Sequence, residues 1–295
     1  MSDEILSLDL GGTHVRVARV ASDGTIIKRI RVATPVADPD PSALVTLIEQ
    51  IRVDSDADRI VIGVPGVVDN ETQTIETGVN LPQAWLPFLG GAWFQERTGL
   101  VVSLANDADL AAVGESSFGA GATFGDTVYV TVSTGVGAGM VLGRRLVGGR
   151  HSGAEIGHTV IDIMAAKDGR PSTVEEIGSG TAIEREAKRS GIEETGAAFA
   201  DLVRAGEPRA SVIWERAMEA VGFGIVNMCW LATPEVVVVG GGVGMNGDIS
   251  LPILRRVVKE HGPAILPVEI VTASLGDDAA LAGAAGWWQA MDHEV

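Results

Sequence analysis

Cysteine and aromatic residues are scarce in this chain. One of the 295 residues is a cysteine, Cys229, and 4% are aromatic. A single cysteine excludes an internal disulfide framework and a cysteine-rich zinc site. Cys229 lies in an apolar run, where we expect a small buried hydrophobe rather than a reactive thiol.

Basic residues are also few. The 22 lysines and arginines face 39 aspartates and glutamates, so the formal net charge is −17. This balance argues against binding nucleic acid or an anionic membrane through a broad basic face. It leaves open a polyanion such as ATP, because a metal ion and backbone N–H groups can meet that charge locally.

Long apolar runs and a Gly-Lys pair are absent. No stretch approaches the roughly 18 apolar residues of a membrane span. The chain starts with an acidic segment, Met1-Ser2-Asp3-Glu4, which is unlike a signal peptide. We therefore expect a cytoplasmic protein without a membrane partner. Without Gly-Lys there is no Walker A loop, which disfavours a P-loop NTPase.

The length and the apolar composition indicate two α/β domains. A chain of 295 residues is too long for one typical core. Apolar residues make up 46% of it, and with so few aromatics alanine and valine carry the core. The expected strands and helices follow in order: strands at 26–32, 59–64, 101–104, 127–132, 140–142, 236–239 and 268–271, and helices at 42–52, 105–118, 251–261 and 278–291.

The first motif is an apolar run, Ile5 to Leu10, that ends in Gly11-Gly12-Thr13 and resumes at Val15. This pattern predicts a strand, a tight turn and a second strand. Asp9 at the end of a buried strand is costly unless it binds a cation. The stretch fits a phosphate turn with a divalent cation, and it fits equally a plain hairpin with a surface aspartate.

The same design returns later in the chain. A shift of 124 positions places Gly135 on Gly11 and Ser133 on Asp9, in a stretch running from Ser133 to Gly139 between two apolar strands. This repeat predicts an internal duplication. A third glycine group, Gly240-Gly241-Gly242, ends the valine strand 236–239. A Rossmann fingerprint also matches at Gly242–Gly247, but it stands near the end of the chain and lacks the ribose acid at the expected spacing.

Five motifs in this order resemble the ROK family. They are Leu8–Thr13, Asn106-Asp107-Ala108, Ser133–Gly137, Glu155-Ile156-Gly157-His158 and Gly240–Val243. The resemblance implies the ribonuclease H-like, actin-type α/β fold, with a nucleotide and sugar cleft between two domains. We expect a small domain of residues 1–107 completed by 279–295, and a large domain of residues 108–278. The family also contains sugar-responsive repressors with a DNA-binding domain before the first motif. Only four residues precede the apolar run at Ile5 here, so we do not expect a repressor.

The resemblance assigns the phosphate end of the cleft to the glycine turns. ATP would be held by Asp9, Gly11, Gly12, Thr13, Thr134, Gly135, Gly137, Gly240, Gly241 and Gly242. Asp9 would bind Mg²⁺, mostly through water, because this ion dehydrates reluctantly.

The resemblance also makes Asp107 the catalytic base, which suits a strand-to-helix junction that fixes its direction. Without the resemblance, Asn106 or Asp107 would be read as a helix cap. Asp109 is expected to be a first-turn acid that interacts with the helix dipole. The sugar would be held by Gly66, Asn80, Asn106, Asp107, Glu155, His158 and Glu175.

The chain departs from the family pattern in two places. Most members carry a cysteine zinc loop after the histidine, but residues 165–175 contain no cysteine. Zinc is therefore not expected, and the sequence does not show what else orients His158. The retained tail of this motif indicates Glu175, not Glu176, as the sugar-contacting acid. The second departure is His14, where members often have lysine.

These features predict ATP-dependent phosphorylation of a hexose at the 6-hydroxyl, with glucose as the first choice. N-acetylmannosamine or N-acetylglucosamine is the alternative substrate. A sugar-binding protein that has lost catalysis is the alternative from another class. The sequence leaves polyphosphate open as the donor, and family analogy gives a homodimer.

Overall fold

Two five-stranded sheets organise the computed structural model, which describes residues 3–78, 80–264 and 267–291. The first sheet has the order β3-β2-β1-β4-β7 and the second has the order β10-β9-β8-β11-β12. The strands of the first are β1 Glu4–Leu10, β2 His14–Ala21, β3 Ile26–Ala33, β4 Arg59–Val64 and β7 Val101–Asn106. Those of the second are β8 Thr127–Val132, β9 Val136–Leu142, β10 Arg145–Leu146, β11 Val236–Gly240 and β12 Glu269–Thr272.

Both sheets follow one plan. An antiparallel hairpin (β1–β2, β8–β9) stands beside a parallel strand that crosses over from elsewhere in the chain (β4, β11), and a second parallel strand follows (β7, β12). The internal duplication that the sequence predicts is therefore confirmed. The four valines of β11 are all fully buried, as expected for a central parallel strand covered on both faces.

Helices cover the outer faces of the two sheets. The first sheet packs with α1 Ser42–Arg52 and α2 Gly91–Thr98, and α1 buries Leu44, Ile48 and Ile51 on one stripe. The second sheet packs with α8 Pro208–Ala232 and α10 Gly247–His261, and the smaller helices α5 Val174–Gly178, α6 Gly180–Arg189 and α7 Gly196–Arg204 pack on α8. The short helix α4 Ile163–Lys167 precedes α5 in the chain. Among the described residues, no helix is both long enough and apolar enough to span a membrane.

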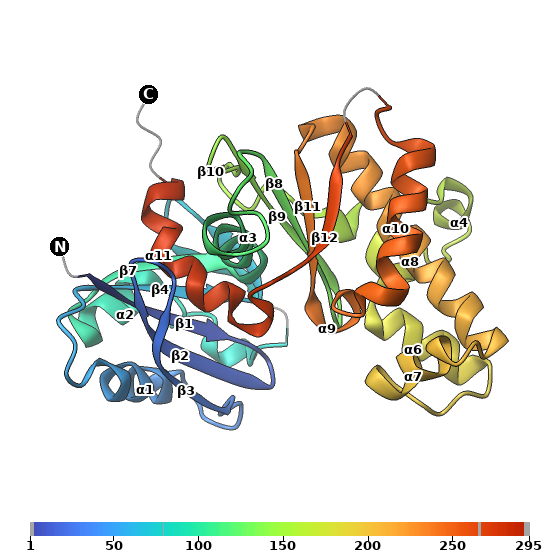
Figure 1. Cartoon of the computed structure of the whole chain (residues 1–295). Helices are drawn as coiled ribbons and strands as arrows, with labels where there is room; N and C mark the ends of the chain where they lie inside the picture. Colours follow the sequence, from blue (N-terminus) through green and yellow to red (C-terminus); the bar gives the residue numbers. More distant parts are fainter. Residues whose placement is uncertain (1–2, 79, 265–266, 292–295) are drawn as a thin grey trace.

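Two helices fill the space between the sheets, α3 Asp107–Phe118 and α11 Ala279–Met291 (Figure 1). They approach so closely that a Cβ on Gly283 would lie 1.9 Å from the carbonyl oxygen of Leu110, and one on Gly114 would lie 2.1 Å from that of Ala279. Only glycine permits this backbone contact. α11 thus returns the end of the chain to the first sheet, where it also packs against β1 and β2.

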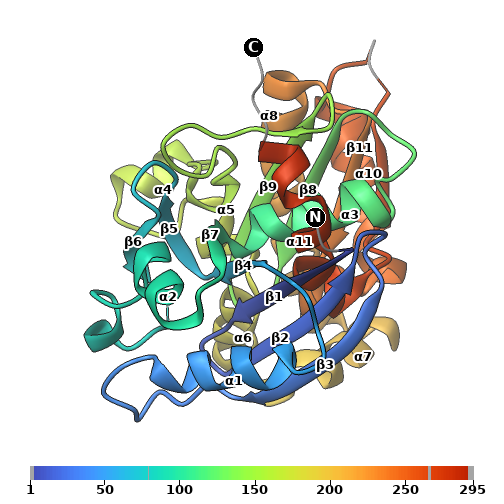
Figure 2. The same cartoon turned by 90° about the vertical axis from the view of Figure 1, so that its left-hand side faces the viewer.

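Some local predictions differ from the structure. The stretch 133–139 is not one long turn, because β9 already starts at Val136. Gly241–Gly244 forms a short helical turn, α9, rather than an open loop, and α10 starts four residues earlier than predicted, at Gly247. The sequence also gave no warning of the hairpin β5 Gly66–Asp69 and β6 Thr74–Gly78, which rises at one side of the first sheet (Figure 2).

We propose that the domain boundary lies at the junction of β7 and α3, as the sequence indicates. The small domain would then comprise 1–107 and 279–295, and the large domain 108–278. The packing of α11 on β1 and β2 supports this division.

Candidate active site

A cleft of about 580 Å³ opens between the two sheets. It collects nearly all the residues that the sequence assigns to the site. At the phosphate end it is lined by Asp9, Gly11, Gly12, Thr134, Gly135, Gly137, Gly241 and Gly242, and at the sugar end by Gly66, Asn80, Asn106, Asp107, Glu155, His158 and Glu175. Their roles toward a ligand stay predictions.

Two predicted residues lie outside the cleft lining. The side chain of Thr13 is exposed, and its carbonyl accepts a hydrogen bond from the Thr34 N–H at 2.9 Å. Gly240 packs under Tyr129, where a Cβ would come within 2.5 Å of the phenol oxygen. His14 is likewise exposed and outside the cleft. The substitution of lysine by histidine there therefore does not alter the cleft wall.

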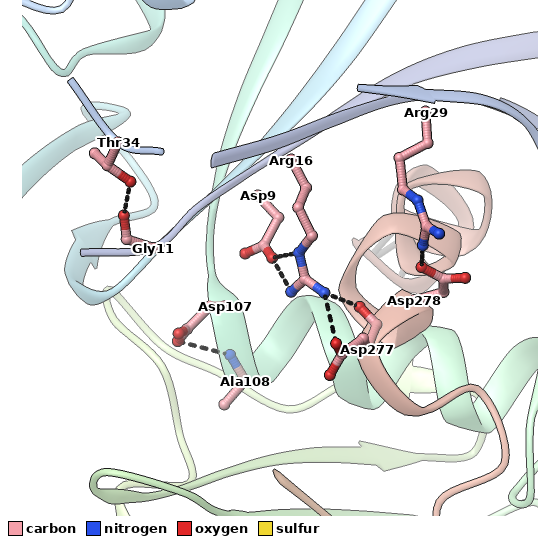
Figure 3. Close-up of polar contacts among 9 residues, drawn as sticks. All are labelled: Asp9, Gly11, Arg16, Arg29, Thr34, Asp107, Ala108, Asp277 and Asp278. Carbon is pink, nitrogen blue, oxygen red and sulfur yellow. Dashed lines mark hydrogen bonds and ion pairs between the residues drawn. The ribbon is translucent and has the colours of Figure 1, made fainter. Parts of the chain in front are cut away.

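Asp9 does find a cation, and it is Arg16 from the neighbouring strand (Figure 3). The Arg16 Nε donates to Asp9 Oδ2 at 2.9 Å, and its Nη2 donates to the same oxygen. The other guanidinium nitrogen donates to the carbonyl of Asp277 in the turn before α11. Arg16 therefore ties the first hairpin to the returning helix and places a positive charge in the cleft wall.

The second carboxylate oxygen of Asp9 is left for a ligand. Oδ1 accepts no hydrogen bond from the residues that the structure describes, although only 7% of the residue is exposed. Burial raises the pKa of Asp9, and the charge and hydrogen bonds of Arg16 oppose that rise. A hard oxygen donor at a cleft edge fits a water-mediated Mg²⁺ ion.

Asp107 begins α3 and lies half-buried in the cleft. Its Oδ1 accepts the Ala108 N–H at 2.9 Å (Figure 3). Burial, followed by the negative charge of Asp9, raises the pKa of Asp107 to about 7. A carboxyl group that titrates near neutral pH is suited to accept a proton in catalysis.

Asn106 is the N-cap of α3. Its Oδ1 accepts the N–H groups of Ala108 at 2.9 Å and Asp109 at 3.2 Å, and its Nδ2 donates to the Gly66 carbonyl at 3.0 Å. The capping interpretation thus holds for Asn106, and it leaves Asp107 free to face the cleft. Through the bond from Nδ2 to Gly66, the Asn106 side chain also joins β7 to the start of β5.

Asp109 lies in the first turn of α3, as predicted, but its side chain is buried. It is 4% exposed, and its Oδ1 accepts the Ser152 hydroxyl at 3.1 Å. Burial raises its pKa to about 7, and the charges of Glu155 and Asp107 act in the same direction. An alanine-rich helix start gave no sign that this position would turn inward.

Glu155 and His158 lie together on the cleft wall of the large half. His158 Nε2 is 4.0 Å from Glu155 Oε2, and both side chains reach solvent in the cleft. Backbone hydrogen bonds close the segment behind them. Val160 pairs with Thr173, and the Ile161 N–H donates to the Ser172 carbonyl at 2.8 Å.

The neighbouring acids Glu175 and Glu176 make different contacts. Glu175 lines the cleft, where its Oε2 accepts the Val136 N–H at 2.9 Å and so supports the second glycine turn. Glu176 points the other way and completes a capping box with Thr173. Glu175 is therefore the acid that faces the cleft.

The sequence missed several residues of the site. Arg16 and Asp277 line the cleft, and a second cavity of about 350 Å³ shares Ser133, Thr134 and Gly242 with it. This cavity is completed by residues of α6, α7, α8 and the turn after β11, namely Gly180, Thr181, Glu184, Gly196, Ala197, Trp214, Val243 and Asn246. Arg16 alternates with valines on a strand, which could have signalled a charge facing the cleft.

Known proteins resemble this chain over nearly its whole length. The model of the ROK family matches residues 5–291. The glucokinase of Thermotoga maritima is 31% identical, with 96% of each chain covered. The N-acetylmannosamine kinase of Yersinia pestis is 33% identical, with 96% of this chain and 97% of that protein covered.

A solved structure gives the same result. The ROK family glucokinase from Streptomyces griseus, in complex with glucose and AMPPNP, superposes with a TM-score of 0.79 at 29% identity. The match covers 96% of this chain and 98% of that one. The family model and the sequence relatives give the family, and the solved structure gives the fold. The chain belongs to the ROK family, has its two-domain actin-like fold, and is a sugar kinase.

Proposed function

We propose that this kinase transfers the γ-phosphoryl group of ATP to the 6-hydroxyl of a hexose, with glucose as the preferred acceptor. The observation that carries the proposal is Asp107, a half-buried carboxyl group with a pKa of about 7, set between the glycine turns and the Glu155–His158 pair. The glucokinase of Thermotoga maritima and the Streptomyces griseus complex with glucose support the choice of sugar.

In this proposal Asp107 accepts the proton of the attacking hydroxyl. Phosphoryl transfer asks the protein mainly for positioning and for charge stabilisation. Asp107 supplies the proton acceptor, and the glycine turns let phosphate oxygens approach the backbone. Arg16 adds a positive charge to the cleft wall beside these turns. Position 14 lies outside the cleft lining, so a lysine there would not supply that charge.

The nucleotide would lie across both cavities. Thr134 and Gly242 belong to both, so a triphosphate in the cleft can continue into a base in the second cavity. Asp9 would hold Mg²⁺ through Oδ1 and water, and the ion when bound would neutralise phosphate charge. Two domains that close on their ligands would keep water from the γ-phosphate.

N-acetylmannosamine is the second candidate acceptor. The relative from Yersinia pestis supports it, at an identity similar to that of the glucokinases. Glu155 favours glucose, because the resemblance implies that N-acetylmannosamine kinases can replace that residue. N-acetylglucosamine stays a third possibility within the same chemistry.

A coupled ADP-release assay tests the proposal. ATP and Mg²⁺ are held constant, and glucose, mannose, N-acetylmannosamine and N-acetylglucosamine are offered singly. We expect glucose to give the highest kcat/KM. If no sugar stimulates ADP formation while isothermal titration still detects sugar binding, the chain is the catalytically silent sugar-binding protein instead. A parallel arm with polyphosphate in place of ATP tests the donor.

We further propose a cytoplasmic homodimer, on the analogy with the family. Light scattering at micromolar concentration would give twice the mass of 30.6 kDa. A monomer mass under those conditions would reject the dimer and leave the kinase proposal intact.

A further inference from the structure

A contact joins the two halves of the molecule on the sugar side of the cleft. The hairpin β5–β6 belongs to the half with the first sheet, and residues 148–152 belong to the half with the second. Figure 2 shows this hairpin standing beside the segments of the second half. The Asn70 N–H donates to the Arg150 carbonyl at 2.8 Å, and the Asn70 Nδ2 donates to the Gly149 carbonyl at 3.1 Å.

An ion pair is at the centre of this contact. The Arg150 Nε and Nη2 donate to Asp69 Oδ2 at 2.8 and 2.7 Å. Asp69 Oδ1 accepts the N–H groups of Glu71 at 2.9 Å and Thr72 at 3.0 Å. These four bonds, with the Thr72 bond the largest cause, hold the pKa of Asp69 at about 2. Asp69 is therefore an ionised, buried partner for Arg150 throughout the physiological range.

Each side of the contact continues directly into a sugar-side wall of the cleft. On one side, β5 runs from Gly66 to Asp69, and Thr77 at the end of β6 precedes Asn80. On the other side, residues 148–152 close through the bridge Gly148–Ser152, and Glu155 follows three residues later. Ser152 is itself fixed to α3 through Asp109. The Asp69–Arg150 pair therefore sets the separation between these two walls.

We propose that Asp69 and Arg150 are positioning residues for the hexose, which hold the Gly66–Asn80 wall and the Glu155–His158 wall at sugar-binding distance. This proposal rests on the proposed function. Neither residue lines the cleft, so both act through the segments that they join. The buried carboxylate and the neutralising arginine also form a link that can break and re-form as the domains open and close.

The same corner offers the atoms of a metal site, and the structure favours the ion pair over a metal. Asp69, Glu76 and His151 bring ligand atoms within 4.8 Å of one another, and His151 Nε2 is 3.2 Å from Glu76 Oε1. Asp69, however, already accepts four hydrogen bonds, which is the capacity of a carboxylate.

Kinetics of four variants test the proposal. Arg150→Met and Asp69→Asn break the ion pair, and asparagine keeps the Oδ1 that closes the turn at 69–72. We expect the hexose KM to rise about tenfold while kcat and the ATP KM change little, because the sugar walls lose their spacing. Arg150→Lys should recover part of the loss. Arg256→Met is the matched control, since it breaks an exposed pair with Glu215 and Glu219 within one half.

A distance measurement tests the same proposal without turnover. Spin labels at Gln50→Cys in α1 and Lys259→Cys in α10 report on the two halves, because both positions are exposed and Cys229 is buried. We expect a narrow distance distribution in the otherwise native chain and a broad one after Arg150→Met, with Arg256→Met unchanged. An unchanged hexose KM and an unchanged distribution in Arg150→Met would overturn the proposal. If no hexose is phosphorylated at all, the distance distributions alone decide it.

Discussion

At the scale of single residues, the site depends on three buried or half-buried aspartates that the protein treats differently. Asp9 is paired with Arg16, Asp69 accepts four hydrogen bonds, and Asp107 has backbone partners only. The carboxyl group with the least compensation for burial has a pKa near 7. Asp109 also has a pKa of about 7, but it does not line the cleft. We therefore propose Asp107 for proton transfer, Asp9 for Mg²⁺ and Asp69 for the contact with Arg150.

The pKa of Asp107 predicts the pH dependence of turnover. A general base must be deprotonated, so kcat/KM for the sugar should fall as pH drops below about 7 and level off above it. We expect a value roughly tenfold lower at pH 6 than at pH 8. Initial rates between pH 5.5 and 8.5 would show this. A flat profile across that range would rule out Asp107 as a base with a pKa near 7.

Asp109 predicts a pH-dependent stability. Its folded pKa of about 7 lies above the ordinary aspartate pKa of 3.8. The stability that the neutral group contributes is complete below the unfolded pKa and is lost as pH rises to the folded one. The free energy of unfolding of Asp109→Asn, measured relative to that of the native chain, should therefore rise by about 2 to 3 kcal/mol between pH 5 and pH 8.

Urea unfolding at the two pH values measures that gain. Asp58→Asn, which changes an exposed carboxyl group, serves as the control. Its free energy of unfolding should differ from that of the native chain by the same amount at both pH values. An equally constant offset for Asp109→Asn would contradict the pKa assigned to Asp109.

At the scale of secondary-structure elements, the crossing of α3 and α11 joins the helix that starts at Asp107 to the last described helix of the chain. α3 carries Asp107 at its start and packs under β8 and β9, while α11 packs against β1 and β2. Because each helix offers a glycine to the other's backbone, α3 and α11 cross in direct backbone contact between the two sheets.

Gly283→Ala should disturb this crossing. The added methyl group would meet the Leu110 carbonyl oxygen at 1.9 Å, so the helices must separate. We expect a loss of about 1 to 3 kcal/mol and a Tm lower by roughly 5 °C, measured by differential scanning calorimetry. Gly149→Ala is the control, because its methyl group meets nothing within 4 Å. Equal Tm values for the two variants would show that the crossing tolerates a side chain.

The sequence predicted the strands and helices whose apolar residues follow a regular period. It did not predict the elements that are held by contacts between residues far apart in the sequence. The valines of β11 and the stripe of α1 signal their structure through periodicity alone. The hairpin β5–β6 has no such signal, because Asp69 and Asn70 in it are held by Arg150, about 80 residues further along the chain. The inward turn of Asp109 is hidden for the same reason, since Ser152 is its partner.

At the scale of the whole molecule, a repeated sheet explains why distant motifs meet. Each copy ends its first strand at the cleft, so the turn after Asp9 and the turn after Ser133 face each other across it. The sequence could predict this pairing from the repeat and the family resemblance. It could not predict the second cavity, because α6, α7 and α8 carry no motif and meet only in the folded chain.

The segment behind His158 predicts independence from zinc. Residues 165–175 contain no cysteine, and backbone bonds at Val160–Thr173 close the segment. We expect elemental analysis to find no stoichiometric zinc in the purified chain. EDTA should stop turnover until Mg²⁺ is restored, and it should leave the Tm unchanged. Zinc that survives gel filtration, with a Tm that falls in chelator, would contradict this account.

The central claim is that Asp107 accepts the proton as a hexose 6-hydroxyl attacks ATP. The most direct test is single-turnover formation of hexose 6-phosphate, followed by ³¹P NMR, in the native chain and in Asp107→Asn. Asparagine keeps the size and the Oδ1 acceptor but cannot take a proton. We predict glucose 6-phosphate from the native chain and a rate at least about a hundredfold lower in the variant, with sugar affinity retained. Native-like formation of the 6-phosphate by Asp107→Asn would contradict the account.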